Sequence, residues 1–255
     1  MLSVLKGFVI AFSMYSKIPM PRVEWEQKNM KYALCFFPFV GLVIGALVYF
    51  WYGLCIHFEV SAVIRTAVMV CIPVILTGGI HVDGLLDTID AISSNKPKEE
   101  KLRILSDPHA GAFAIIYCVI YFILMFAFAY EVTPFSIVII SLTFVLSRAM
   151  SAFSIVAFKM AKDTGLARTF SDMSAKIIVG ITSLVYIFAC IFLMMWYNIF
   201  IGGIAIAVAI LTFLYYRYKS YKNFGGITGD LCGYFLQLCE LIILICVVGG
   251  EIICF

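Results

Sequence analysis

Residues 65–94 read RTAVMVCIPVILTGGIHVDGLLDTIDAISS, a stretch that joins a long apolar run directly to a group of acidic residues. A helix needs about 20 apolar residues to cross a membrane, and the run up to Gly79 supplies most of them. Asp83, Asp87 and Asp90 follow at spacings of four and three residues, so a helix places their carboxylates on one face. Like charges repel in this arrangement, which indicates that a cation neutralises them.

The composition of the whole chain is that of a polytopic membrane protein. Of its 255 residues, 64% are hydrophobic and 13% are charged, and the mean hydropathy is +1.06. Soluble domains contain about 45–50% apolar and 25% charged residues. No linker, low-complexity tract or internal repeat is visible, so we expect one membrane-embedded domain over residues 1–255. The net charge of +3 is too small to indicate a nucleic-acid partner.

The apolar runs predict an all-α bundle of about seven transmembrane helices. The expected spans are 32–56, 61–80, 110–129, 134–158, 176–196, 199–216 and 231–250. The N-terminal segment is shorter and is interrupted by Lys6. We expect it to form an interfacial helix, with an eighth span as the alternative.

The distribution of Lys and Arg predicts the orientation of these spans. Basic residues occur in the connection before the first span and in every second connection after it, whereas the connections around 57–60, 131–133 and 197–198 contain none. By the positive-inside rule the basic connections are cytoplasmic. The aspartates therefore belong to the cytoplasmic side of a multi-pass protein.

Two further polar strings fall on the same predicted side, KLRILSDPHAGAFA at 101–114 and NFGGITGDLCGY at 223–234. Carboxylate oxygens suit Mg²⁺, which proteins hold with one or two carboxylates together with substrate phosphates. We therefore predict a Mg²⁺ site on Asp83, Asp87 and Asp90. The alternative is a solvated acidic face at the end of a helix.

Other polar residues allow two interpretations each. His81 and His109 have no second histidine or cysteine at ligand spacing, so we expect hydrogen-bonding loop residues rather than a zinc site. Lys101 either contacts phosphate or only sets the topology. The GGITGD turn at 225–230 either brings backbone amides close to an anion or caps a helix through Thr228 or Asp230.

Taken together, these strings resemble a known family. TGGIHVDGLLDTIDA, KLRILSDPHAGAFA, FPFVGLVIGALV at 37–48, LSRAM at 146–150 and GGITGDLCGYFLQLCEL at 225–241 are similar to the cobalamin synthases, the adenosylcobinamide-GDP ribazoletransferases. The order and separation of the strings fit over nearly the whole chain. Ala91 stands where a glycine is expected, and Pro108 and His109 stand where a Ser and Arg pair is common.

The resemblance implies a Mg²⁺-dependent phosphotransferase of the bacterial or archaeal inner membrane, with its active site facing the cytoplasm. The substrates would be adenosylcobinamide-GDP and α-ribazole or its 5′-phosphate, the products adenosylcobalamin or its phosphate and GMP. Partners would be the lipid bilayer and either a second copy of the chain or other cobalamin-pathway enzymes.

Roles for individual residues follow from the same resemblance. Asp83, Asp87 and Asp90 would hold the metal, and Asp83, Asp87 or Asp107 would take the proton of the attacking hydroxyl. The candidate substrate-binding residues are His81, Lys101, His109, Arg148, Gly226, Thr228 and Asp230.

Two alternatives belong to other functional classes. A CDP-alcohol lipid phosphotransferase would also place clustered aspartates at a membrane face, but the chain has no arginine four residues after Gly84 and lacks the fuller run of spaced acids. A cation-coupled transporter would use charges within the membrane, such as Arg148 and Glu240.

Arg148 and Glu240 are also expected at the same depth. Each lies about ten residues, or roughly 15 Å, from the cytoplasmic end of its span. An unpaired charge at that depth is costly, so we predict a buried ion pair that ties the fourth span to the seventh. The alternative is that each binds backbone carbonyls, water or substrate separately.

Overall fold

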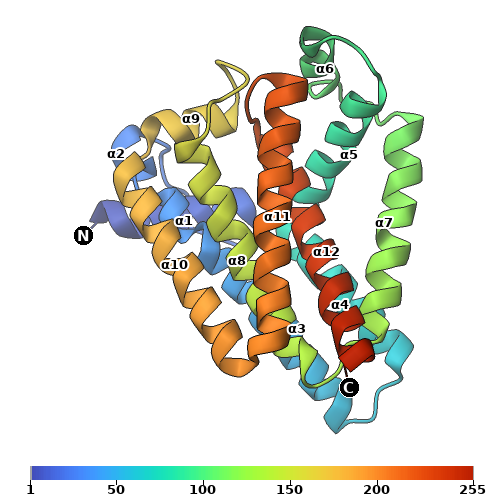
Figure 1. Cartoon of the computed structure of the whole chain (residues 1–255). Helices are drawn as coiled ribbons and strands as arrows, with labels where there is room; N and C mark the ends of the chain where they lie inside the picture. The colour runs from blue at the N-terminus through green and yellow to red at the C-terminus, as the bar shows by residue number, and fades with distance from the viewer. Residues whose placement is uncertain (1, 255) are drawn as a thin grey trace.

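The computed structural model describes residues 2–254, and over this range the chain forms helices and one isolated bridge but no strand. Figure 1 shows the long helices side by side in one bundle. The helices are α1 (Leu2–Tyr15), α2 (Gln27–Met30), η1 (Ala33–Phe36), α3 (Phe37–His57), α4 (Ala62–Thr77), α5 (Ile80–Ser93), α6 (Lys98–Ile104), α7 (Ala112–Tyr130), α8 (Ser136–Ala157), α9 (Leu166–Met173), α10 (Lys176–Tyr197), α11 (Ile199–Phe224) and α12 (Gly229–Cys254).

Helices α8 and α12 form the centre of the bundle. In each of them 78% of the apolar stretch is buried, against 22% in α7 and in α10. The outer helices expose large apolar side chains such as Ile116 and Ile123 on α7 and Ile181 and Phe188 on α10. Such surfaces suit a lipid environment, where a helix satisfies its backbone hydrogen bonds internally. The chain is therefore a multi-pass membrane protein.

The predicted spans match the observed helices closely. Within residues 2–254, six helices are long and apolar enough to cross a membrane, or up to seven spans if α4 and α5 count as one broken span. The sixth span differs from the expected 199–216, because α11 continues to Phe224. Its last turns carry Arg217, Lys219 and Lys222, and basic residues are favourable near the C-terminus of a helix.

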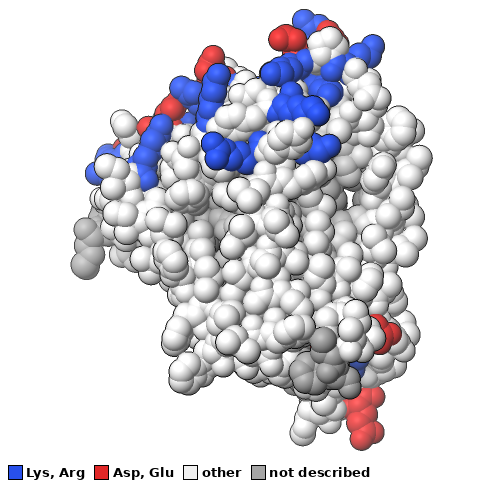
Figure 2. Space-filling model, viewed as in Figure 1, with Lys and Arg blue, Asp and Glu red and all other residues white. Residues whose placement is uncertain are grey.

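Most of the basic residues gather at one end of the bundle. Figure 2 shows Lys and Arg side chains concentrated there, while a largely uncharged belt separates them from a few charged residues at the other end. We call this the charged end; it consists of α2, α5, α6, α9, the connections beside them, the end of α11 and the start of α12. The predicted alternation of basic and non-basic connections is thus confirmed.

The chain bends sharply between α4 and α5. The two helices meet at 90°, and the bend lies at Gly78 and Gly79, whose φ angles of 65° and 79° are in the left-handed region that glycine favours. The backbone N–H of Lys17 binds the carbonyl of Leu76 at 2.7 Å, which fixes the end of α4. We therefore treat α4 as the membrane-crossing helix and α5 as part of the charged end.

The N-terminal segment forms a helix of 14 residues, α1. It is shorter than the helices that qualify as spans, and Figure 1 shows it running across the bundle rather than along it. This placement agrees with the expectation of an interfacial helix and not with an eighth span.

Candidate active site at the charged end

The three sequence-predicted aspartates lie on α5, but in different surroundings. Asp83 is exposed, whereas Asp87 and Asp90 are partly buried. Asp90 accepts hydrogen bonds from the backbone N–H groups of Gly111 and Ala114, at 2.5 and 2.8 Å. A carboxylate at this position satisfies free amides and complements the dipole at the start of α7. Asp90 therefore ties α5 to α7.

A fourth carboxylate comes from α12. Gly84 packs against the backbone of Asp230, and a Cβ at Gly84 would lie only 2.6 Å from the carbonyl oxygen of Asp230. The missing side chain lets α5 and α12 approach closely, as small residues do where membrane helices cross. The contact brings Asp230, predicted as a substrate-binding residue, into the group of α5 acids.

The pKa of Asp87 reflects the negative charge of these neighbouring carboxylates. Burial first, and then neighbouring carboxylates, raise the pKa of Asp87 to about 7. The contributing carboxylates, in order of effect, are Asp83, Asp230 and Asp90, while Lys162 opposes them. The group is short of positive charge, which suits a divalent cation.

The side chains as they stand do not form a complete ligand set. Among the described residues, no three His, Cys, Asp or Glu side chains are grouped closely enough to hold a metal ion. The donor chemistry of Asp83, Asp87 and Asp230 nevertheless fits Mg²⁺, which takes carboxylate oxygens and keeps several waters or phosphate oxygens as further ligands. Asp90 differs, because both of its oxygens already bind backbone amides.

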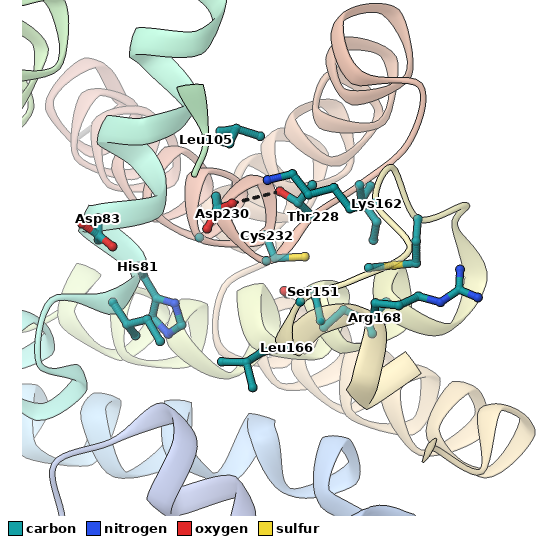
Figure 3. A pocket seen from close by; sticks show the side chains of 18 of the residues that line it. His81, Asp83, Leu105, Ser151, Lys162, Leu166, Arg168, Thr228, Asp230 and Cys232 are labelled. Carbon is teal, nitrogen blue, oxygen red and sulfur yellow. Dashed lines mark hydrogen bonds between the residues drawn. The ribbon is translucent and has the colours of Figure 1, made fainter. Parts of the chain in front are cut away.

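A cavity of about 270 Å³ opens beside these acids, between α1, α3, α5, α8 and α12. Asp83 and Asp230 line one side, and Lys162 and Arg168 come from the connection and helix after α8. Figure 3 shows the Lys162 amine on the side of Asp230 and Thr228, whereas the Arg168 guanidinium points away from them. Arg168 instead binds Asp172 at 2.7 Å. Lys162 is therefore the cation that faces the acidic wall.

The connection that carries Lys162 is held by the glycine-rich turn before α12. The N–H of Ile227 binds the carbonyl of Lys159, and the N–H of Ala161 binds the carbonyl of Ile227, both at 2.8 Å. A Cβ on Gly226 would overlap the backbone of residues 159–161. Gly226 is thus required for the contact between two backbones, and this contact sets the position of Lys162.

Thr228 caps α12, as one of the two interpretations of the turn predicted. Its hydroxyl accepts the N–H of Leu231 at 3.3 Å, and it donates to Asp230 at 3.4 Å. Thr228 also lines the cavity together with Gly229. The cap and a contact with a bound anion are therefore compatible.

Like Asp87 and Asp90, three other predicted site residues lie apart from the cavity lining. Lys101 is buried and donates to Asn223 at 2.7 Å, which ties α6 to α11. Asp107 and His109 are exposed and bind each other at 2.8 Å. Hydrogen bonds from His109 lower the pKa of Asp107, so this carboxylate is a weaker base than an ordinary aspartate. Their neighbour Ser106 does reach the cavity, and it accepts a hydrogen bond from Lys162 at 2.6 Å.

His81 lies in the first turn of α5 rather than in a loop, so that expectation was wrong. Its ring is buried. It stacks with Tyr15 and is tilted against Phe37, with centroid distances of 6.3 and 5.8 Å. Its Nε2 atom finds no hydrogen-bond partner among the described residues. His81 lines the cavity, and its role as a substrate-binding residue stays a prediction.

The predicted ion pair within the membrane is confirmed. Arg148 Nη1 lies 2.8 Å from Glu240 Oε1, and both side chains are buried. Ser147 donates to the same carboxylate at 2.8 Å, and Arg148 also donates to the carbonyl of Phe144 at 3.0 Å. Since these charges bind each other, they are not free to form a transporter's ion pathway.

Sequence reasoning missed Lys162, the contribution of Arg168 and Ser151 to the cavity, and the role of Tyr15 and Phe37. By the positive-inside rule, the basic residues after α8 indicate only topology. A signal was present in KDTGLAR at 162–168, where two cations flank a Thr-Gly pair. Nothing in the sequence, however, places that connection against α5.

The fold and the site together define a multi-pass membrane protein with an acid-lined cavity at the charged end. The sequence model of the family described as cobalamin-5-phosphate synthase matches residues 7–248. The chain belongs to this family.

Curated relatives agree with the assignment. An adenosylcobinamide-GDP ribazoletransferase of Lachnoclostridium phytofermentans is 42% identical over 247 residues, covering 97% of this chain and 95% of the relative. The enzyme of the same name from Clostridium botulinum is 32% identical, with 95% and 96% coverage. That of Fusobacterium nucleatum is 28% identical, with 93% and 95% coverage. No solved structure matches the chain.

Proposed function

We propose that this chain is an adenosylcobinamide-GDP ribazoletransferase that uses Mg²⁺ and accepts α-ribazole or α-ribazole 5′-phosphate. The observation that carries the proposal is the cavity in which Asp83 and Asp230 face Lys162, in a member of the cobalamin-5-phosphate synthase family. An excess of carboxylates beside one amine is suited to a metal and to phosphate oxygens.

The reaction exchanges one phosphoester bond for another. An acceptor hydroxyl attacks the phosphorus next to cobinamide, the new O–P bond forms, and the bond to GMP breaks. Because the 5′ position is already esterified in α-ribazole 5′-phosphate, an enzyme that accepts both acceptors must use another ribose hydroxyl. The proton of that hydroxyl passes to one of the cavity carboxylates.

The protein's own groups act mainly by positioning and charge. Asp83, Asp87 and Asp230 would hold Mg²⁺, which supplies neutralisation of the phosphate oxygens. Lys162 would bind a phosphate oxygen beside them, and Ser106 and the turn at 226–228 keep its amine in place. Such fixed charges are most of what phosphoryl transfer requires of a protein.

Purified protein in detergent tests this proposal. With Mg²⁺, adenosylcobinamide-GDP and α-ribazole, we expect release of GMP that depends on both organic substrates. Chelation of divalent ions should stop the release, and renewed Mg²⁺ should restore it. Release of GMP without the acceptor would contradict the proposed transfer reaction. Full turnover in the presence of chelator would contradict the proposed dependence on Mg²⁺.

We further propose that the charged end faces the cytoplasm of a bacterial or archaeal cell, in the inner membrane. Lys96 at the charged end and Glu131 at the other end are both exposed. Each position is replaced by cysteine in a background without reactive cysteines. An impermeant reagent should label the cysteine at Lys96 only from the inside of the membrane and the cysteine at Glu131 only from the outside. Labelling of both from the same side would overturn the orientation.

A further inference from the structure

The cavity has a mouth and an interior of different character. The residues at the mouth are charged or exposed and include Asp83, Leu166 and Lys162. The interior is formed by buried side chains from five helices. They are Tyr15, Phe37, His81, Ser151, Ile155 and Leu236. A compound bound there would have an apolar part inside and its reacting part at the acids.

Three rings form one wall of the interior. Tyr15 on α1 and Phe37 on α3 have centroids 4.1 Å apart, and the His81 imidazole lies within 6.3 Å of both. Figure 3 shows the imidazole between the α5 backbone and the middle of the cavity, opposite Ser151. Aromatic walls of this kind favour flat ring systems, which stack at centroid distances of about 4.5–7 Å.

Two buried polar atoms in the interior have little or no bonding within the protein. Nε2 of His81 has no hydrogen-bond partner in the described part of the chain, and the Ser151 hydroxyl has only the weakly bonding thiol of Cys232, although both residues are at most 5% exposed. Buried polar groups nearly always find a partner. A ligand with one or two hydrogen-bonding atoms on an otherwise apolar edge would satisfy them.

The size of the cavity and the chemistry of its lining indicate which organic group of the two substrates fits the interior. Pockets for drug-sized molecules are roughly 300–1,000 Å³, so a cavity of about 270 Å³ admits a small ring system and excludes a corrin. Guanine has several N–H donors and requires carboxylates or carbonyls to accept them, but the carboxylates here stay at the mouth. The substituted benzimidazole of α-ribazole is flat and apolar, and it has one free ring nitrogen that accepts a hydrogen bond.

We infer that the interior of the cavity binds the base of the nucleoside acceptor against Tyr15, Phe37 and His81, with Ser151 donating a hydrogen bond to the ring nitrogen. This inference rests on the proposed function. It places the ribose at the mouth, where its hydroxyl meets Asp83 and Asp230. The donor remains outside, with its diphosphate beside Lys162 and its corrin beyond the cavity.

Replacement of Ser151 tests the inference. Ser151→Ala should raise the KM for α-ribazole about three- to tenfold, the range for one lost hydrogen bond, and leave the KM for adenosylcobinamide-GDP unchanged. The matched control is Ser154→Ala, one turn further along α8, whose hydroxyl binds the carbonyl of Ser151 at 2.7 Å. It should leave both KM values within about twofold of the wild type. Leu236→Phe places a larger side chain in the interior from α12. It should also raise the KM for α-ribazole and leave the KM for adenosylcobinamide-GDP unchanged.

Binding without turnover keeps the inference separate from the proposed function. Equilibrium dialysis of labelled α-ribazole against the detergent-solubilised protein measures its Kd directly. The Kd of Ser151→Ala should exceed that of the wild type by the same factor as the KM for α-ribazole. A wild-type protein that binds α-ribazole but releases no GMP would refute the proposed function alone. A higher KM for the donor in Ser151→Ala would place guanine in the interior, and unchanged affinity for α-ribazole in both Ser151→Ala and Leu236→Phe would also overturn the inference.

Discussion

The chain handles charge in opposite ways in two regions. Within the membrane, Arg148 and Glu240 form a one-to-one pair, and Ser147 and a backbone carbonyl supply further hydrogen bonds. At the charged end, Asp83 and Asp230 line a cavity together with Lys162, and the pKa of the nearby Asp87 is raised by burial and by the charges of these two carboxylates. The first region is balanced by the protein itself, whereas the second retains an excess of negative charge.

The difference separates a structural from a functional use of charge. Balanced, buried charges fix how two helices pack, and their loss is felt as lost stability. Unbalanced carboxylates destabilise the folded protein through repulsion, and they are useful only if a bound cation or substrate compensates them. Substitutions in the two regions should therefore affect different measurements.

The largest effect is expected at the buried pair. Arg148→Met leaves Glu240 uncompensated and should lower the free energy of unfolding by about 3–5 kcal/mol. Thermal melting in detergent measures the loss. The double variant Arg148→Met/Glu240→Leu should recover part of it, because two apolar side chains need no partner. Purely additive losses in the two single variants and the double variant would show that the pair contributes no coupling.

Lys162 should show the reverse pattern. Lys162→Met removes the cation that faces the acids and should lower kcat/KM about 100-fold. The free energy of unfolding should fall by no more than about 1 kcal/mol, because Lys162 offsets the repulsion between the acids only at a partly exposed site. Lys159→Met, three residues earlier in the same connection and exposed, is the control and should retain activity. Equal losses in both variants would mean that only the overall positive charge matters.

Asp90 offers a contrast on the same helix as Asp83. Asp90→Ala removes the hydrogen bonds to the amides of Gly111 and Ala114 and should cost about 1 kcal/mol of stability, as the loss of a helix cap does. Asp83→Ala should leave the melting temperature unchanged or raise it, since it relieves repulsion. The two variants are compared by thermal melting without divalent ions. A loss of stability in Asp83→Ala but not in Asp90→Ala would contradict the roles assigned here.

The sequence predicted the architecture well because the membrane imposes simple rules. Apolar runs define the spans, and basic residues mark alternate connections. The Arg148–Glu240 pair follows from counting residues from the same membrane face. The 90° bend at Gly78 and Gly79 was not predicted, because two glycines permit a bend without fixing its angle.

The site was predicted only in part, for a reason that concerns packing. Asp83, Asp87 and Asp90 share a helix, so spacing alone grouped them. Which of them meets the cavity depends on the rotation of α5, and the role of Asp230 depends on its contact with Gly84. Lys162 reaches the site through the backbone contact with the turn at 225–228. Contacts between elements distant in sequence leave no spacing pattern to read.

Mg²⁺-dependent melting tests the central claim most directly. If the excess of carboxylates binds a divalent ion, Mg²⁺ at about five times its Kd should stabilise the wild-type protein by about 1 kcal/mol, or roughly 2–4 °C in Tm. The double variant Asp83→Asn/Asp87→Asn should fold and show no Mg²⁺-dependent rise, while Arg148→Met should keep the rise from a lower starting Tm. The same Mg²⁺-dependent rise in the double variant and the wild type would contradict the account.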